Sequence, residues 1–214
     1  MVDENNILHG TTTLGLVCRD GIVIAADKRA TAGHLIVNKN AEKVHQIHKN
    51  MAVTLAGTVS DAQLLVKLIK AELALKGIRS GRDPTVKEAG NLLAGLVYSN
   101  IRKMSMIPGV SHFLLGGKDT EGFHLYDIFA DGSLTEEDKY VSSGSGCVFA
   151  LGVLETLYNE SITIEEGIEL AIKSVNAALQ RDSASGNGIR IITITKDGVE
   201  KVLDQDIDTG IKSK

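Results

Sequence analysis

The sequence predicts an α+β fold in which helices pack on the outer faces of mainly antiparallel sheets. Strand and helix signals come in blocks, in the order strands, two helices, strands, two helices, strands, and do not alternate strictly. A four-layer α/β/β/α sandwich fits this order, as do other α+β arrangements. The 214 residues contain no stretch with linker composition and 43% of them are hydrophobic, so we expect one domain with a sizeable core.

The chain is predicted to open with a β-hairpin. The motif TTTLGLVCRDGIVIAAD (11–27) carries β-branched residues on both sides of the turn Arg19-Asp20-Gly21, and Asp-Gly is a strong hairpin signal. Residues 22–26 are continuously apolar, which indicates a strand buried on both faces. Further strands are expected at about residues 34–37, 42–48 and 51–57.

Two helices are expected next. Residues 60–63 have the form of a capping box, and apolar residues recur at helical spacing up to Gly77, so the first helix should span about 61–76. A second capping box, formed by Thr85 and Glu88, predicts a helix that ends before Pro108.

The second half of the chain repeats this pattern. Strands are expected near 110–117, 123–129 and 136–141. One helix should begin after the motif SSGSG (142–146), and another should run from the capping box of Thr163 and Glu166 to about Asp182. The motif GIRIITIT (188–195), the turn Lys196-Asp197-Gly198 and the motif VEKVL (199–203) predict a closing hairpin.

Charge and cysteine content exclude several function classes. The net charge is −4, from 23 basic and 27 acidic residues without a basic block, which argues against nucleic acid as a partner. The first ten residues lack the basic start and apolar centre of a secretory signal, and no run of 18 apolar residues suggests a membrane span. Cys18 and Cys147 lack metal-ligand spacing, as do the histidines. We therefore expect reduced thiols, a cytoplasmic location, and neither metal nor cofactor.

The motif HGTTTLG (9–15) admits a structural and a chemical interpretation. Threonines are common in strands, so the motif could simply begin one. Cleavage of the Gly10–Thr11 bond, however, would give Thr11 a free α-amine, whose reference pKa of about 7.7–8.0 suits a base near pH 7. Nucleophile and base would then lie on one residue. Gly10, which has no side chain, permits the tight turn that presents its carbonyl to the Thr11 hydroxyl.

Two charged residues could complete such a site. Asp27 ends the predicted buried strand, and Lys43 lies in the strand predicted over 42–48. A carboxylate and an ammonium beside Thr11 would hold each other charged, and the cation would favour the deprotonated hydroxyl. Their spacing equally allows a surface ion pair of little energetic value.

Five motifs, in this order and spacing, resemble those of archaeal-type 20S proteasome β subunits. The motifs are GTTTLGLVCRDGIVIAADKRAT, NKNAEKVHQI, MAVTLAGTVSDAQ, SSGSG and QRDSASGNG. The resemblance extends from Thr11 to about residue 205 and implies the four-layer fold of the N-terminal nucleophile hydrolases. It also implies that residues 1–10 are a propeptide removed by autoprocessing and that 11–214 form a single catalytic domain.

The resemblance implies a role for each matching site residue. Thr11 corresponds to the nucleophile, Asp27 and Lys43 to the acid and lysine beside it, and the Gly57 backbone N–H to the donor that holds the oxyanion. Residues that position the α-amine and its water correspond to Ser145, Asp182 and Ser185. The first specificity pocket corresponds to Ala30, Thr31, Ala41, His45, Leu55 and Val59. No charged side chain dominates that pocket, which favours a chymotrypsin-like preference for apolar residues.

The resemblance also implies an assembly. Two β-subunit heptamer rings, capped by α-subunit rings and opened by an ATPase unfoldase ring, would enclose the sites that degrade unfolded polypeptides. Three alternatives remain at this point: a bacterial HslV-type peptidase of the same fold, a non-catalytic structural ring subunit, and a small-molecule amidase with the same nucleophile.

Overall fold

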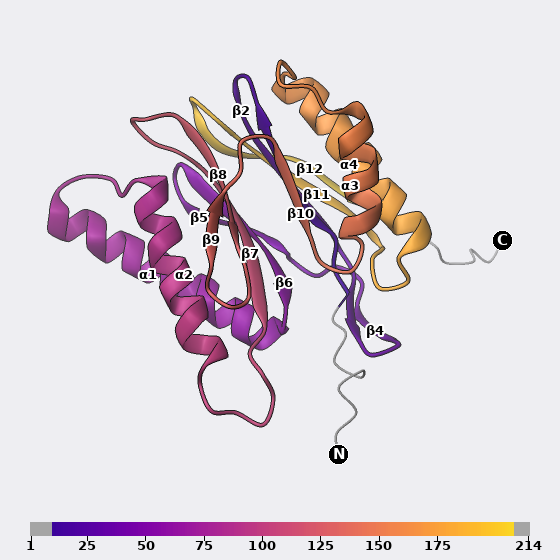
Figure 1. Ribbon diagram of the computed structural model, residues 1–214, viewed down its shortest axis with the longest axis horizontal. Helices are drawn as coiled ribbons and strands as arrows, with labels where there is room; N and C mark the ends of the chain where they lie inside the picture. Colours follow the sequence, from indigo (N-terminus) through magenta and orange to yellow (C-terminus); the bar gives the residue numbers. More distant parts are fainter. Residues whose placement is uncertain (1–9, 208–214) are drawn as a thin grey trace.

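The computed structural model describes residues 10–207 as four layers, with two helices on the outer face of each of two stacked sheets (Figure 1). Both sheets have five strands and every pairing is antiparallel. This arrangement confirms the predicted fold class. Across the same residues, no helix combines the length and apolar character needed to span a bilayer.

The element bounds follow the predicted blocks. One sheet contains, in spatial order, β10 (Tyr140–Ser143), β1 (Thr13–Cys18), β2 (Gly21–Asp27), β11 (Gly188–Thr195) and β12 (Gly198–Asp206). The other contains β5 (Val44–His48), β6 (Met51–Gly57), β7 (Ser111–Lys118), β8 (Phe123–Ile128) and β9 (Leu134–Glu136). A separate pair comprises β3 (Ala30–Ala32) and β4 (Leu35–Asn38). The helices are α1 (Val59–Ser80), α2 (Val86–Ile101), α3 (Cys147–Leu157) and α4 (Ile164–Arg181).

Three apolar clusters join the layers. Phe113 and Leu114 are neighbours on β7 and point to opposite faces, as side chains of a strand must. Phe113 therefore joins the cluster beneath α1 and α2, whereas Leu114 joins the cluster between the sheets. Leu14 belongs to the third cluster, beneath α3 and α4. All of β2 is buried, which confirms that this strand is covered on both faces.

Two of the three predicted capping boxes are present. Thr85 with Glu88, and Thr163 with Glu166, each make both reciprocal hydrogen bonds. The box predicted over residues 60–63 is wrong: α1 begins earlier, after Thr58, and the Ser60 hydroxyl bonds to the Asp61 carboxylate instead.

The predicted C-terminal end of α1 is also wrong. The helix continues past Gly77 to Ser80 and ends at Gly81, which adopts the left-handed conformation with φ 67°. Gly81 accepts this conformation without a Cβ clash and donates its N–H to the Gly77 carbonyl, so the second glycine and not the first ends the helix. A smaller difference concerns Lys43, which lies immediately before β5 and not within it.

Candidate active site

Thr11 is buried just before strand β1 and is still joined to Gly10. Its side-chain hydroxyl donates to the Gly10 carbonyl oxygen at 2.6 Å, so the expected nucleophile lies against the carbonyl of the bond that is expected to be cut. Its backbone N–H donates to the Ser145 hydroxyl at 3.3 Å. Residue 10 is the first that the structure describes, and the rest of the expected propeptide lies outside the described residues.

Asp27 and Lys43 form a buried ion pair beside this bond. Lys43 Nζ lies 2.7 Å from Asp27 Oδ1, and the two side chains are 4% and 0% exposed. Nζ also donates to the Gly10 carbonyl oxygen at 3.2 Å. A surface ion pair, which the spacing alone allowed, is therefore excluded, and the cation lies where negative charge would develop if Thr11 attacked Gly10.

Backbone hydrogen bonds fix the Asp27 carboxylate, and burial shifts the pKa of Lys43. The Asp27 carboxylate accepts the backbone N–H groups of Thr12, Arg29 and Gly186 at 2.9–3.0 Å, which hold it in place beside Lys43. Burial lowers the pKa of the Lys43 ammonium, and the negative charge of Asp27 opposes this effect. Lys43 can therefore give up its proton more readily than an exposed lysine.

Ser145, Asp182 and Ser185 lie together on the other side of Thr11. Ser145 precedes α3, Asp182 caps the C-terminal end of α4, and Ser185 lies in the loop that follows. Both serine hydroxyls donate to Asp182 Oδ2 at 2.6 Å. Since Ser145 also accepts the Thr11 N–H, the carboxylate is connected to the atom that would become the α-amine if the Gly10–Thr11 bond were cleaved.

Gly57, at the end of β6, borders the same cavity as Thr11. Its φ is +108°, and an added Cβ would lie 2.2 Å from the Val110 carbonyl oxygen, so both conformation and space require glycine here. The predicted role of its N–H as an oxyanion donor stays a prediction.

A cavity of about 330 Å³ adjoins Thr11. Five of the six residues predicted for the specificity pocket line it: Ala30, Thr31, Ala41, Leu55 and Val59. His45 is not among the lining residues, contrary to expectation. Its ring is hydrogen-bonded at 3.1 Å to the Glu42 carbonyl oxygen, and burial lowers its pKa. Glu42 and Gln63 line the cavity instead, and sequence reasoning did not select them.

Thr12 is a site residue that sequence reasoning missed. Its backbone N–H donates to Asp27 Oδ1, and its hydroxyl lies 2.7 Å from the Ser185 hydroxyl. Thr12 thus joins the Asp27–Lys43 pair to the Ser145–Asp182–Ser185 group. The signal was present in the run of three threonines, but only the first was assigned chemistry.

Arg29 was also missed, although it follows Asp27 closely. Its guanidinium bonds to the Asn187 side chain at 2.8 Å and to the Ser183 carbonyl at 2.9 Å. It lies against Gly186, where an added Cβ would come within 2.2 Å of the guanidinium. Arg29 therefore holds the loop that carries Ser185.

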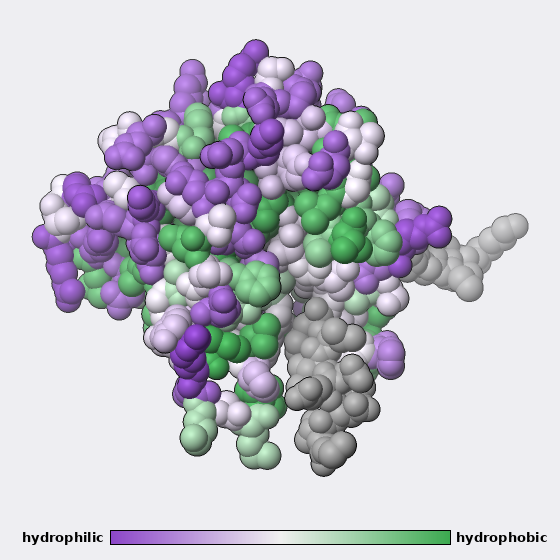
Figure 2. Space-filling model, viewed as in Figure 1, coloured by the Kyte–Doolittle hydropathy of each residue, from purple (hydrophilic) through white to green (hydrophobic). Residues whose placement is uncertain are grey.

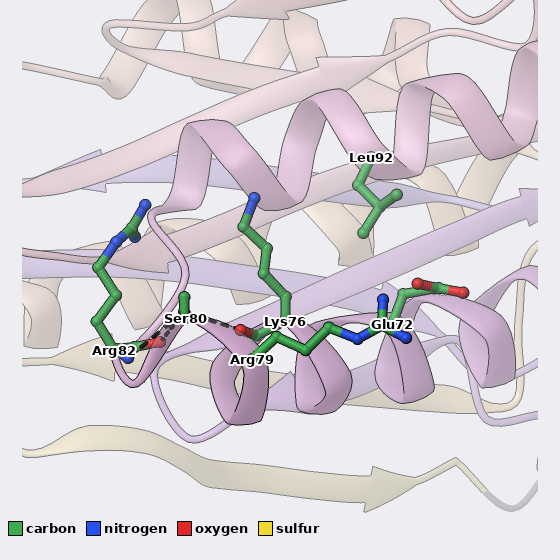
Figure 3. Close-up of a pocket in the computed structure, with 6 residues that line it drawn as sticks. All are labelled: Glu72, Lys76, Arg79, Ser80, Arg82 and Leu92. Atoms are coloured by element: carbon green, nitrogen blue, oxygen red, sulfur yellow. Dashed lines mark hydrogen bonds between the residues drawn. The ribbon is translucent and has the colours of Figure 1, made fainter.

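A second hollow lies at the opposite end of α1. It is lined by Glu72, Lys76, Arg79, Ser80, Arg82 and Leu92 (Figure 3). Arg79 is about 30 Å along the helix from Val59, which lines the Thr11 cavity. Lys76 and Arg82 both pair with Glu88, so much of the charge is already compensated. This hollow shares no lining residue with the cavity beside Thr11.

Comparisons with known proteins show the family of this chain. The sequence model of the family described as proteasome subunit matches residues 7–194. A protein named proteasome subunit beta from Archaeoglobus profundus is 41% identical over 210 residues, which covers 98% of this chain and 96% of that protein. Proteins with the same name from Archaeoglobus fulgidus and Methanobrevibacter ruminantium are 44% and 38% identical, covering 91% and 99% of this chain and 89% and 98% of theirs. The chain therefore belongs to the proteasome subunit family.

Proposed function

We propose that the chain is the catalytic β subunit of a 20S proteasome core particle, a threonine endopeptidase activated by cleavage of its own Gly10–Thr11 bond. The observation that carries this proposal is the contact between the Thr11 hydroxyl and the Gly10 carbonyl oxygen, which also accepts a hydrogen bond from Lys43. Family membership and the names of the relatives support the β-subunit assignment.

In the first step, Thr11 Oγ1 attacks the Gly10 carbonyl carbon. The Thr11 nitrogen is still an amide and cannot accept the proton, whereas Lys43 reaches the same carbonyl oxygen and has a lowered pKa. Neutral Lys43 takes the hydroxyl proton, and Asp27 stabilises the ammonium that results. The Lys43 ammonium gives this proton to the Thr11 nitrogen as the C–N bond breaks, so the Gly10 acyl group is left on the Thr11 oxygen as an ester and the nitrogen leaves as an amine. Water then hydrolyses the ester to a Gly10 carboxylate and the free Thr11 hydroxyl. The leader departs and Thr11 gains its α-amine.

The processed residue then carries out peptide hydrolysis by the same chemistry. The α-amine accepts the proton of the Thr11 hydroxyl, directly or through a water, while the Ser145–Asp182–Ser185 group holds that amine in position. The Gly57 N–H stabilises the oxyanion as the ester acyl-enzyme forms. Water activated by the same amine releases the product.

Substrates are proposed to be unfolded polypeptides bound as an added strand. Backbone groups at Thr31 and Gly57 would pair with the substrate, and such pairing does not depend on side-chain identity. This mode suits an enzyme that degrades many sequences, with the cavity beside Thr11 taking the residue before the cut.

Such an enzyme is proposed to work inside a chamber of β heptamer rings capped by α rings and served by an ATPase unfoldase in the cytoplasm. Exposed apolar residues support burial against other subunits. On α1, exposed fractions of 40% to 80% are found at Leu64, Leu68, Leu75 and Ile78. Met104 and Met106, between α2 and β7, are 100% and 99% exposed. The segment that joins α2 to β7 lies at the foot of the molecule in Figure 1, and Figure 2 shows apolar residues on the surface there.

The test is the intact mass and peptidase activity of the β chain assembled with its α subunit. We expect a chain that begins at Thr11, in a ring particle that hydrolyses fluorogenic peptides. A stable full-length chain in an assembled but inactive particle would contradict the proposal and favour a structural ring subunit.

Cleavage is expected to be fastest after apolar residues. Ala30, Ala41, Leu55 and Val59 offer apolar surface in the cavity, and a buried charge without a partner is costly there. Glu42 would additionally repel acidic side chains. In a peptide series that differs only in the residue before the cut, kcat/KM should be at least about tenfold higher for leucine or phenylalanine than for glutamate. Equal rates after apolar, acidic and basic residues would contradict this prediction.

A further inference from the structure

Both backbone polar groups of Gly10, the N–H and the carbonyl oxygen, are hydrogen-bonded. Its carbonyl oxygen accepts from Thr11 and Lys43, as described above, and its N–H donates to the Thr31 side-chain hydroxyl at 3.0 Å. Thr31 lies on β3 and is 5% exposed, so this hydrogen bond is buried. The mechanism of peptide hydrolysis gives the Thr31 hydroxyl no role, because substrate pairing there uses the backbone.

The place that Gly10 occupies is closed to side chains. A Cβ at this position would lie 1.8 Å from the Ala184 Cβ, 2.5 Å from the Ala184 carbonyl oxygen and 2.6 Å from its Cα. Two of these atoms are backbone atoms, so a rotamer change cannot make room. A substrate with a side chain before the cut cannot follow the backbone path of Gly10, and its N–H must lie elsewhere.

We propose that the Thr31 hydroxyl is a positioning residue for leader removal, which anchors the Gly10 N–H while Thr11 attacks the neighbouring carbonyl. This inference rests on the proposed function and deepens it. Glycine has the widest choice of backbone conformations, so a Gly10 without this anchor can rotate its carbonyl away from Thr11 and Lys43. The hydrogen bond selects the reactive conformation and thereby gives the leader bond a contact that ordinary substrates do not use.

The test compares leader removal with peptide hydrolysis in Thr31→Val. Valine is close to threonine in shape but cannot accept the Gly10 N–H, which leaves a buried donor unsatisfied. Separately purified α and full-length β chains are mixed, and the mass of the β chain is followed over time. We expect leader removal to slow about tenfold in Thr31→Val, and clearly more than kcat/KM for a fluorogenic peptide falls once the leader has gone. Thr31→Ser, which keeps the hydroxyl, should restore the processing rate.

Two results would overturn the inference: leader removal by Thr31→Val at the wild-type rate, or equal losses in processing and in peptide hydrolysis. Native particle mass checks assembly, and if valine prevents assembly, Thr31→Ala removes the hydroxyl without adding bulk and is judged by the same two rates. The wild-type chain separates failure of this inference from failure of the proposed function. A wild-type particle that keeps residues 1–10 and lacks peptidase activity would contradict the proposed function itself.

Discussion

Replacing Thr11 with alanine is expected to abolish peptide hydrolysis and to leave residues 1–10 attached. The Thr11 hydroxyl is the only group of that residue able to attack either the Gly10 carbonyl or a substrate carbonyl, and it already touches the Gly10 oxygen at 2.6 Å. Loss of a covalent nucleophile reduces kcat by at least about a thousandfold. Intact mass and a fluorogenic peptide assay on the assembled particle measure both effects.

Thr11→Ser is the matched variant, because it keeps the hydroxyl and loses only the methyl group. We expect it to remove the leader and to retain measurable peptidase activity, which would assign the loss in Thr11→Ala to the oxygen atom. Hydrolysis at the wild-type rate by Thr11→Ala, or loss of its leader, would show that another group is the nucleophile.

Gly10→Ala is expected to prevent leader removal in the assembled particle. The new methyl group would overlap Ala184, with 1.8 Å between the Cβ atoms and 2.6 Å from the Cβ to the Ala184 backbone Cα. The carbonyl of residue 10 must therefore move away from the Thr11 hydroxyl and from Lys43. Because reactions depend steeply on the placement of reacting atoms, we expect processing to slow by about a hundredfold or more, and peptidase activity to fall with it.

A glycine on α2 provides the control for this substitution. At Gly95 an added Cβ meets no atom within 4 Å, and the residue lies in a helix where alanine is favoured over glycine. Gly95→Ala should process its leader at the wild-type rate. Rapid processing of Gly10→Ala would contradict the steric argument. It would also contradict the claim that the backbone at Gly10 follows a path closed to residues with side chains.

Local sequence patterns predicted the elements well where the signal was itself local. The capping boxes of Thr85 and Thr163 and the hairpin turn at Asp20-Gly21 are present because each depends on residues within one turn of each other. The bounds of α1 were predicted wrongly: Ser60 and Gly77 are plausible helix ends by composition, but the helix begins after Thr58 and continues until Gly81 adopts the left-handed conformation.

The candidate site shows the same difference between local signals and contacts that join distant parts of the chain. The resemblance named Thr11, Asp27, Lys43 and the residues around Asp182, and the structure brings them together. Thr12 escaped notice because its partner, the Ser185 hydroxyl, is 173 residues away in the chain. The resemblance assigned His45 to the pocket, yet its ring bonds to the nearby Glu42 backbone and does not line the cavity.

The sequence by itself determined the order of strands and helices and the acidic balance of charge, and its resemblance to proteasome β subunits selected Thr11, Asp27 and Lys43 as candidate site residues. Only the tertiary structure decided that the Lys43 ammonium reaches the Gly10 carbonyl, that Ala184 closes the space beside Gly10, and that Thr31 holds its N–H. These contacts join segments that lie far apart in the chain, so they exist only once the two sheets have packed and the loops at their edges have met. No local pattern in the sequence encodes such distances.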